Sequence, residues 1–264
     1  MSIYSNPAKA GFFYALEMKQ QYDNYTAEDH EVWSILFERQ MRNLENKVKQ
    51  DYLDCVQGLY PAFNPQTVPS FEEIDQILMG ATQWEIQVVP GLIPVEDFFA
   101  LLADRKWCSS TWLRKKSQLD YIEEPDMFHD VFGHLPLLMN STYASFMQRF
   151  GELGVKHLND KQVLTALQRL YWYTIEFGLS MREGKTEIYG AGIISSSGET
   201  HHVYNDPIEV KPFDVIEVIN LPFENDVIQN TYFQIQRFEE LYQSLDILER
   251  RIETGLKVTP GIVR

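Results

Sequence analysis

Apolar residues recur every three or four positions along most of the chain, which is the spacing of helices that bury one face. The longest run starts at Thr26, which can form a capping box with Asp29, and continues to Val56 before a proline-containing segment, 58–69. A second capping box opens at Ser70. The predicted helices cover residues 26–56, a short stretch from 70, 95–105, 140–157, 160–182 and 238–252.

Patterns typical of strands are confined to short segments of the chain. Strands are predicted over residues 84–88, 215–221 and 232–235. The predicted fold is therefore mainly α, a single domain of many helices with a few short strands. Because nothing marks a linker, we expect an irregular N-terminal arm over 1–25, one domain over 26–255 and a C-terminal tail over 256–264.

The charge balance narrows the possible partners. The chain has 23 Lys and Arg against 38 Asp and Glu, a net charge of −15, so no basic patch for nucleic acid or an anionic membrane is expected and small-molecule chemistry is favoured. No apolar stretch approaches membrane-spanning length, and the N-terminus lacks a basic region followed by an apolar run. Cys55 and Cys108 are too few for a disulfide framework. We expect a cytoplasmic protein.

Two of the six histidines, His129 and His134, lie in an otherwise apolar segment, 121–136, that also carries carboxylates. On a straight α-helix, residues five apart point about 140° away from each other and could not bind one ion. Gly133 can end the helix in a left-handed cap and Pro136 cannot continue it, which would swing His134 back toward His129. The two histidines are therefore a candidate chelate.

Glu176 is the candidate third ligand, because it is the only acidic residue between Asp160 and Glu183. An ionised carboxylate among aromatic and aliphatic residues is costly unless a cation compensates it. Two imidazoles and one carboxylate that leave positions open on a metal describe the facial triad of non-haem Fe(II) enzymes, although these residues alone do not favour iron over zinc. The alternative is a hydrogen-bonded pair of core histidines and a Glu on a helix face.

Three motifs in a fixed order give the chain a resemblance to a known family. They are Glu124-Pro125-Asp126 with His129-Asp130, Gly133-His134 and Pro136; then Tyr171-Trp172-Tyr173-Thr174-Ile175-Glu176-Phe177-Gly178; then Tyr189-Gly190-Ala191-Gly192-Ile193-Ile194-Ser195-Ser196-Ser197-Gly198-Glu199. The chain resembles the catalytic domain of the tetrahydropterin-dependent aromatic amino acid hydroxylases, and its bacterial phenylalanine hydroxylases most of all. The resemblance extends from about residue 27 to about residue 250.

The resemblance implies a monooxygenase that hydroxylates the ring of a free aromatic amino acid with Fe(II), O₂ and a tetrahydropterin such as tetrahydrobiopterin. It implies that His129, His134 and Glu176 hold the iron and that 26–255 is the catalytic domain. Phenylalanine, converted to tyrosine, is the expected substrate, and tyrosine or tryptophan are open alternatives. We expect a monomer, because the chain has no room for the regulatory domain and tetramerisation helix of the larger animal members.

The resemblance also assigns a pterin site. Main-chain groups of the segment after Pro90 would bond to the pterin ring, an aromatic ring would stack on it, and Asp130 and a tyrosine would lie beside it. Asp130 replaces a Glu that most of the family carries, so its carboxylate is one methylene shorter. The residues concerned are Gly91, Leu92, Ile93, Phe98, Asp130 and Tyr171.

An amino-acid site is assigned in the same way. Arg114 would bind the α-carboxylate, because a guanidinium can hold a carboxylate through two parallel bonds. Ser195 would lie near that carboxylate and near one histidine ligand. Ile122 stands where animal members have a Thr that helps to hold the amino acid. The remaining residues expected near the substrate are Pro125, Trp172 and Phe177.

Two other functions are compatible with parts of the sequence. Phe128-His129-Asp130 with Gly133-His134 superficially resembles an HD-type metal phosphohydrolase, which needs a further upstream histidine, and His30 is the one available. A non-catalytic pterin-binding or amino-acid-binding protein is the second alternative. His201 and His202 lie beyond the matched motif and before a turn, so we expect both to be surface histidines.

Overall fold

The computed structural model describes residues 18–120, 122–225 and 227–261. The parts of the predicted arm and tail at 1–17 and 262–264 lie outside these residues. The helices are η1 (Tyr22–Asn24), α2 (Ala27–Leu44), α3 (Gln50–Gly58), α4 (Phe71–Ala81), α5 (Val95–Ala103), η2 (Lys116–Gln118), η3 (Phe128–His134), η4 (Leu135–Met139), α6 (Ser141–Lys156), α7 (Lys161–Tyr171), η5 (Trp172–Glu176), α8 (Ala191–Ile194), α9 (Ser197–Asn205), α10 (Val215–Asn220) and α11 (Phe238–Glu253). The strands are β1 (Glu85–Val88), β2 (Lys106–Ser109), β3 (Leu179–Arg182), β4 (Lys185–Ile188), β5 (Glu209–Pro212) and β6 (Thr231–Ile235). The predicted mainly α fold is confirmed.

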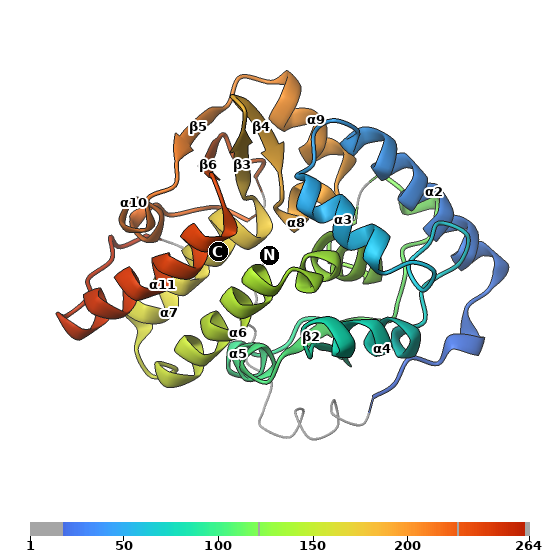
Figure 1. Cartoon of the computed structure of the whole chain (residues 1–264), viewed down its shortest axis with the longest axis horizontal. Coiled ribbons are helices and arrows are strands. Elements are labelled where there is room, and N and C mark those ends of the chain that lie inside the picture. Colours follow the sequence, from blue (N-terminus) through green and yellow to red (C-terminus); the bar gives the residue numbers. More distant parts are fainter. Residues whose placement is uncertain (1–17, 121, 226, 262–264) are drawn as a thin grey trace.

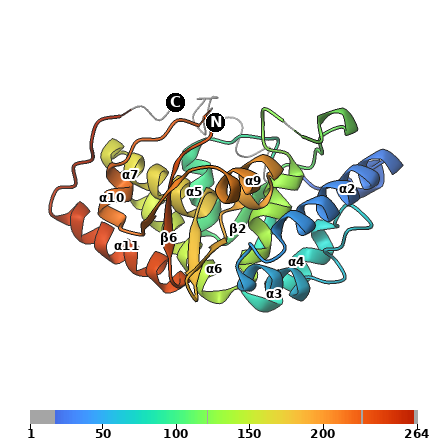
Figure 2. The ribbon, with the colours of Figure 1, turned by 90° about the horizontal axis from the view of Figure 1, so that it is seen from above.

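The helices form two groups that lie on opposite sides of the molecule in both views. Helices α2, α3 and α4 make one group and α7, α10 and α11 make the other, with α5 and α6 between them (Figures 1 and 2). A four-stranded sheet of order β4-β3-β6-β5 lies beside the second group, and β1 pairs in parallel with β2. Within the described part of the chain, none of the helices has the length and apolar character needed to cross a membrane.

The helix predicted over 26–56 is two helices, so that prediction is wrong in its extent. The capping box of Thr26 and Asp29 is confirmed at the start of α2. The chain then turns at Asn46, which has a φ of 60°, before α3 begins. The turn lets the segment before α3 pair with the end of β4, where Lys49 N–H donates to the Ile188 carbonyl and Ile188 N–H to the Lys47 carbonyl. Apolar spacing alone does not reveal the break, because both helices bury the same kind of face.

The strand predicted over 215–221 is also wrong, because this segment forms α10. Asp214 caps the helix by accepting hydrogen bonds from the N–H groups of Ile216 and Glu217. Val215, Val218 and Ile219 are buried, which is the three-and-four spacing of a helix face. A short run of β-branched residues does not distinguish a buried helix turn from a strand.

The helix predicted over 160–182 begins as expected, with Asp160 as its cap, but ends at Glu176. The following residues form β3, which pairs with β4 and β6. The strands predicted over 84–88 and 232–235 correspond to β1 and β6, and the final helix predicted over 238–252 corresponds to α11.

The described ends of the chain pack against the body. Gln20 donates to the Pro69 carbonyl and accepts from Phe71 N–H. At the other end, the wholly buried guanidinium of Arg169 donates to the carbonyls of Ile219 and Thr259. Residues 18–25 and 256–261 are thus tied to the helices by specific hydrogen bonds.

Candidate active site

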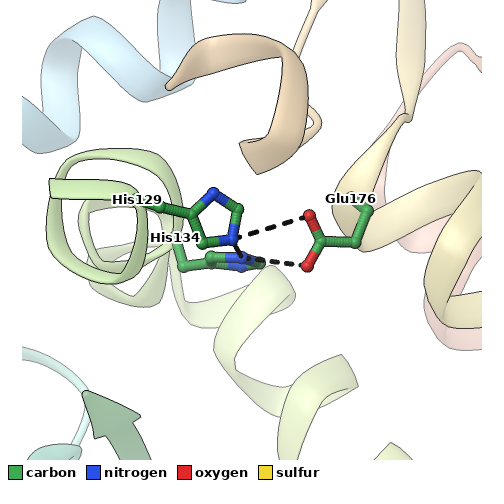
Figure 3. A group of neighbouring side chains, drawn as sticks. All are labelled: His129, His134 and Glu176. Atoms are coloured by element: carbon green, nitrogen blue, oxygen red, sulfur yellow. Dashed lines mark hydrogen bonds and ion pairs between the residues drawn. The ribbon is translucent and has the colours of Figure 1, made fainter. Parts of the chain in front are cut away.

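Segment 128–134 brings the two histidines together by a route that the sequence prediction did not anticipate. Residues Phe128–His134 form a π-helix, in which each turn closes between residues i and i+5. Residues five apart therefore lie about one turn apart on the same side. The Nε2 atoms of His129 and His134 are 3.2 Å apart (Figure 3). The predicted left-handed cap is wrong, since Gly133 lies inside this helix.

Gly133 has a different role, which is to let two helices approach each other. A Cβ on this residue would lie 2.8 Å from the Ala191 carbonyl oxygen and 3.3 Å from the Ser195 Cβ. The close approach of η3 to α8 brings Ser195 to the first histidine, with its Oγ 2.9 Å from His129 Nδ1. This contact fixes the ring so that Nε2 faces His134.

Glu176 reaches the histidines from a separate element, η5, which continues α7. It ends η5, a second π-helix at the end of α7, and its carboxylate points toward both imidazoles (Figure 3). Its Oε1 lies 3.2 Å from His134 Nε2 and its Oε2 lies 3.8 Å from His129 Nε2. A Cβ on Gly190 would lie 2.5 Å from the Glu176 carbonyl oxygen, so the turn at Gly190 packs directly on this backbone.

The protonation states of His129 and Glu176 suit a cation site. Among the described residues, His129, His134 and Glu176 form the group whose ligand atoms lie within 4.8 Å of one another. Burial lowers the pKa of His129 to about 4, so this imidazole is neutral at pH 7. Burial raises the pKa of Glu176, but the neighbouring histidines outweigh it and hold the pKa at about 2. A neutral imidazole and an ionised carboxylate are the forms that bind metal, and the set fits a divalent iron.

The metal-binding group opens onto a cavity of about 250 Å³. Most of the residues that the resemblance assigned to a site line this cavity, and Arg114 and Ser195 are the two that do not. The assigned residues on the wall are Gly91, Leu92, Ile93, Phe98, Pro125, His129, Asp130, His134, Tyr171, Trp172, Glu176 and Phe177.

The structure adds cavity residues that the sequence reasoning missed. Trp107 packs on His134 with ring centroids 4.5 Å apart, and Phe223 stacks on Trp172 at 4.3 Å and 7°. Asn225 also lines the cavity. Trp107 lies on a short strand with no chemical signature, so no pattern in the sequence indicates it. Phe223 and Asn225 belong to the segment after α10, outside the three motifs that carry the resemblance.

Asp130 faces the cavity and is tethered to its wall. Its Oδ2 accepts a hydrogen bond of 2.9 Å from Ser110 N–H, and its own carbonyl accepts from Trp107 Nε1. Burial raises the pKa of this carboxyl to about 7 although the Ser110 bond lowers it. One oxygen of the carboxylate is therefore already bonded to the backbone N–H of Ser110.

Arg114 forms a buried ion pair beside the cavity. Its Nε lies 2.8 Å from Asp126 Oδ2 and its Nη2 lies 2.9 Å from Asp126 Oδ1, so the Nε–Nη2 edge of the guanidinium holds this aspartate through two parallel bonds. Asp126 also accepts from the N–H of Arg114 and from that of His129, at the start of the π-helix. A substrate carboxylate would have to use the donors that Asp126 leaves. Sequence reasoning missed Asp126 as the partner, although it lies in the first motif.

The histidines predicted to be on the surface differ from each other. His201 is exposed. The His202 side chain is 12% exposed and lies between the Asp206 carboxylate and the Gln229 carbonyl oxygen. His30 accepts a hydrogen bond from Val68 N–H. Neither His201, His202 nor His30 joins the metal-binding group of the described residues. The arrangement that an HD-type phosphohydrolase requires is therefore not formed around His129.

Comparisons with known proteins agree with the site geometry. Phenylalanine-4-hydroxylase of Ralstonia nicotianae is 41% identical over 228 residues, which are 86% of this chain and 72% of that protein. A phenylalanine hydroxylase structure from Chromobacterium violaceum with bound iron(III) and 7,8-dihydrobiopterin is 37% identical, has a TM-score of 0.84 and covers 95% of this chain and 91% of that one. The iron-bound and phenylalanine-bound structure from the same organism is 35% identical, has a TM-score of 0.82 and covers 95% and 92%. The model of the biopterin-dependent aromatic amino acid hydroxylase family matches residues 6–259, and this chain belongs to that family.

Proposed function

We propose that this protein is a phenylalanine 4-monooxygenase that converts free phenylalanine to tyrosine with Fe(II), O₂ and a tetrahydropterin. The observation that carries the proposal is the convergence of His129, His134 and Glu176 on one side of an aromatic cavity. The phenylalanine hydroxylases that the chain resembles support the choice of phenylalanine over tyrosine and tryptophan.

His129, His134 and Glu176 would hold the iron, as two imidazoles and one carboxylate that leave the other coordination positions free. Bound iron and tetrahydropterin supply the activation of O₂ that ring hydroxylation requires. The chain itself keeps these ligands oriented. Ser195 holds His129 through Nδ1, and the Trp107 ring packs on His134, so each imidazole has a fixed direction.

The pterin would occupy the part of the cavity next to the segment 91–93. Main-chain groups of Gly91, Leu92 and Ile93 would bond to its ring, and Phe98 would pack on it. Tyr171 lies beside Phe98, with ring centroids 5.5 Å apart, and completes this wall. The free oxygen of Asp130 would accept a hydrogen bond from the pterin, directly or through a water.

The amino acid would place its ring against the opposite wall. Phe177 and Phe223 both pack on Trp172 there, and the three offer an apolar surface that would exclude water from the reacting ring. Arg114 would attract the α-carboxylate with the donors not used by Asp126. Hydroxylation of an arene needs no protein nucleophile, so these residues act by positioning.

The experiment that tests the proposal is a turnover assay with ferrous iron, O₂ and synthetic tetrahydrobiopterin. Phenylalanine, tyrosine and tryptophan are supplied separately, and the hydroxylated products are quantified by chromatography. Tyrosine formed from phenylalanine, with a higher kcat/KM than for the other two substrates, is the expected result. A preference for tyrosine or tryptophan would correct the substrate, and pterin or amino-acid binding without any product would support a non-catalytic binding protein.

We further propose that the protein is a cytoplasmic monomer and that its catalytic unit extends beyond 26–255. The acidic charge and the two free cysteines are consistent with the compartment. The hydrogen bonds of Gln20 and Arg169 support including residues 18–25 and 256–261. Sedimentation velocity measures the oligomeric state, and removal of residues 256–264 should lower the melting temperature if this segment belongs to the unit.

A further inference from the structure

Trp172, on the cavity wall, is held by two ring contacts and one hydrogen bond. Its ring stacks on Phe223 at 4.3 Å and packs at 46° on Phe177. Its indole Nε1–H also donates a hydrogen bond of 2.7 Å to the side-chain oxygen of Gln229. Stacking fixes the plane of an indole but allows it to slide and turn in that plane, whereas a hydrogen bond to its one polar atom fixes the remaining direction.

Gln229 is placed to act on Trp172 and not on the substrate. It does not line the cavity, and it lies near the end of the segment 221–230, whose described residues form no helix or strand. Its Nε2 is buried and has no hydrogen-bond partner among the described residues. The Gln229 side chain therefore makes its polar contact through the amide oxygen, which accepts from the Trp172 indole.

His202 fixes Gln229 from the side away from the cavity. Its Nε2 lies 3.0 Å from the Gln229 carbonyl oxygen and its Nδ1 lies 2.7 Å from Asp206 Oδ2. The histidine comes from α9 and Asp206 ends that helix, so the contact ties an irregular segment to a regular one. Its spacing in the sequence indicated no role for His202, and this contact gives it one.

We propose that Gln229 is a positioning residue for the aromatic wall of the amino-acid site, and that His202 holds it in place. The chain of contacts runs from Asp206 through His202 and Gln229 to Trp172, which touches the cavity. This inference rests on the proposed function, because it assigns Trp172 to the phenylalanine side of the cavity. It predicts an effect on amino-acid binding that is separate from iron and pterin.

The principal test compares Gln229→Leu with Gln229→Glu in the iron-loaded protein. Leucine removes the accepting oxygen, and the KM for phenylalanine should rise roughly fivefold to tenfold, the range that corresponds to the loss of one hydrogen bond. Glutamate keeps an acceptor for the indole N–H and puts a negatively charged oxygen in place of the nitrogen that has no partner. Because an N–H bonds a carboxylate at least as strongly as an amide oxygen, the KM should return to within about twofold of the parent value. The pterin KM and the iron content should stay unchanged in both variants.

A second variant tests the contact that holds Gln229, at a residue that does not line the cavity. His202→Ala removes the contact to the Gln229 carbonyl, and the KM for phenylalanine should rise about twofold to threefold without a change in pterin KM. The matched control is Asn230→Ala, an exposed neighbour of Gln229 that should leave all constants at parent values. If Gln229→Leu does not fold, His202→Ala still decides the question.

Several outcomes would overturn the inference. They are a phenylalanine KM that is unchanged in Gln229→Leu, a KM that rises equally for pterin, or a glutamate variant that behaves like the leucine variant. Calorimetric titration of phenylalanine into each protein under anaerobic conditions checks that the KM change reflects binding. A parent protein that makes no tyrosine contradicts the proposed function instead, whereas turnover in the parent with identical values in every variant contradicts only the role of Gln229.

Discussion

The metal-binding group and the aromatic wall beside it differ in how they are built. Both histidines and Glu176 belong to π-helices, and their side chains are 3% to 20% exposed. Phe223, Asn225 and Gln229 belong to a segment without helix or strand, where Val227 is 56% exposed. The proposed iron ligands thus sit on regular elements braced by close backbone contacts. The wall is mixed, because Trp172 shares η5 with Glu176, whereas Phe223 lies on a loop held by a few side chains.

Holding a metal and shaping a substrate site place different demands on the structure. A ligand set must keep its atoms within fractions of an ångström, which regular elements provide. A substrate wall needs shape, and loops change shape by substitution without disturbing the core. We therefore expect substitutions in the metal-binding group to abolish function and substitutions near the wall to change affinity.

The largest effect is expected from the ligands themselves. His129→Ala and His134→Ala should each lose bound iron and turnover together, since each removes one of three ligands. Elemental analysis after gel filtration measures the iron, and His201→Ala, at an exposed histidine, is the control. Full iron occupancy in either ligand variant would show that the assignment of that histidine is wrong.

The next effect concerns Arg114, whose partner Asp126 also accepts a hydrogen bond from His129 N–H. Arg114→Ala should raise the KM for phenylalanine at least about tenfold and also lower the free energy of unfolding by about 3–5 kcal/mol, because Asp126 is left buried without its partner. Urea unfolding and steady-state kinetics measure the two parts. Lys116→Ala, which breaks a half-exposed pair with Glu31, should cost less than about 1 kcal/mol. Lost stability with an unchanged KM would mean that Arg114 serves only Asp126.

A smaller effect is expected at Gly133, where η3 packs against α8. A methyl group there would lie 2.8 Å from the Ala191 carbonyl oxygen, so Gly133→Ala should cost about 1–3 kcal/mol through overpacking. Gly198→Ala is the matched control, because its nearest atom would be 3.9 Å away. Thermal unfolding of both variants measures the difference. Equal melting temperatures would contradict a tight contact between η3 and α8.

The smallest effect is expected at Asp130. Glutamate is one methylene longer, so its carboxylate would reach about 1.5 Å further into the cavity, and Asp130→Glu should lower the KM for tetrahydropterin about twofold to fivefold. The iron content and the KM for phenylalanine should stay nearly the same. Steady-state titration with pterin decides between this result and a KM that rises or stays flat, which would mean that the longer side chain overpacks the wall beside Ser110.

Much of the molecule follows from the sequence because the relevant interactions are local. The caps at Thr26 and Asp160 are bonds between residues two or three apart, and they begin helices where the pattern indicates. The three metal-binding residues were identified from their types and their apolar neighbours, since a carboxylate buried beside two imidazoles is costly without a cation to compensate it. Their proximity is now seen, while their role as iron ligands remains a proposal.

Other features were decided only when the chain folded. The π-helix at 128–134, the break before α3 and the helix α10 each depend on partners far along the chain, such as Ala191 for Gly133 and Ile188 for Lys49. The pairing of Arg114 with Asp126 and of Trp172 with Gln229 likewise joins segments whose spacing in the sequence carries no signal. A local pattern fixes which face of a helix is apolar, but the neighbour that this face meets is set by the packing of the whole chain.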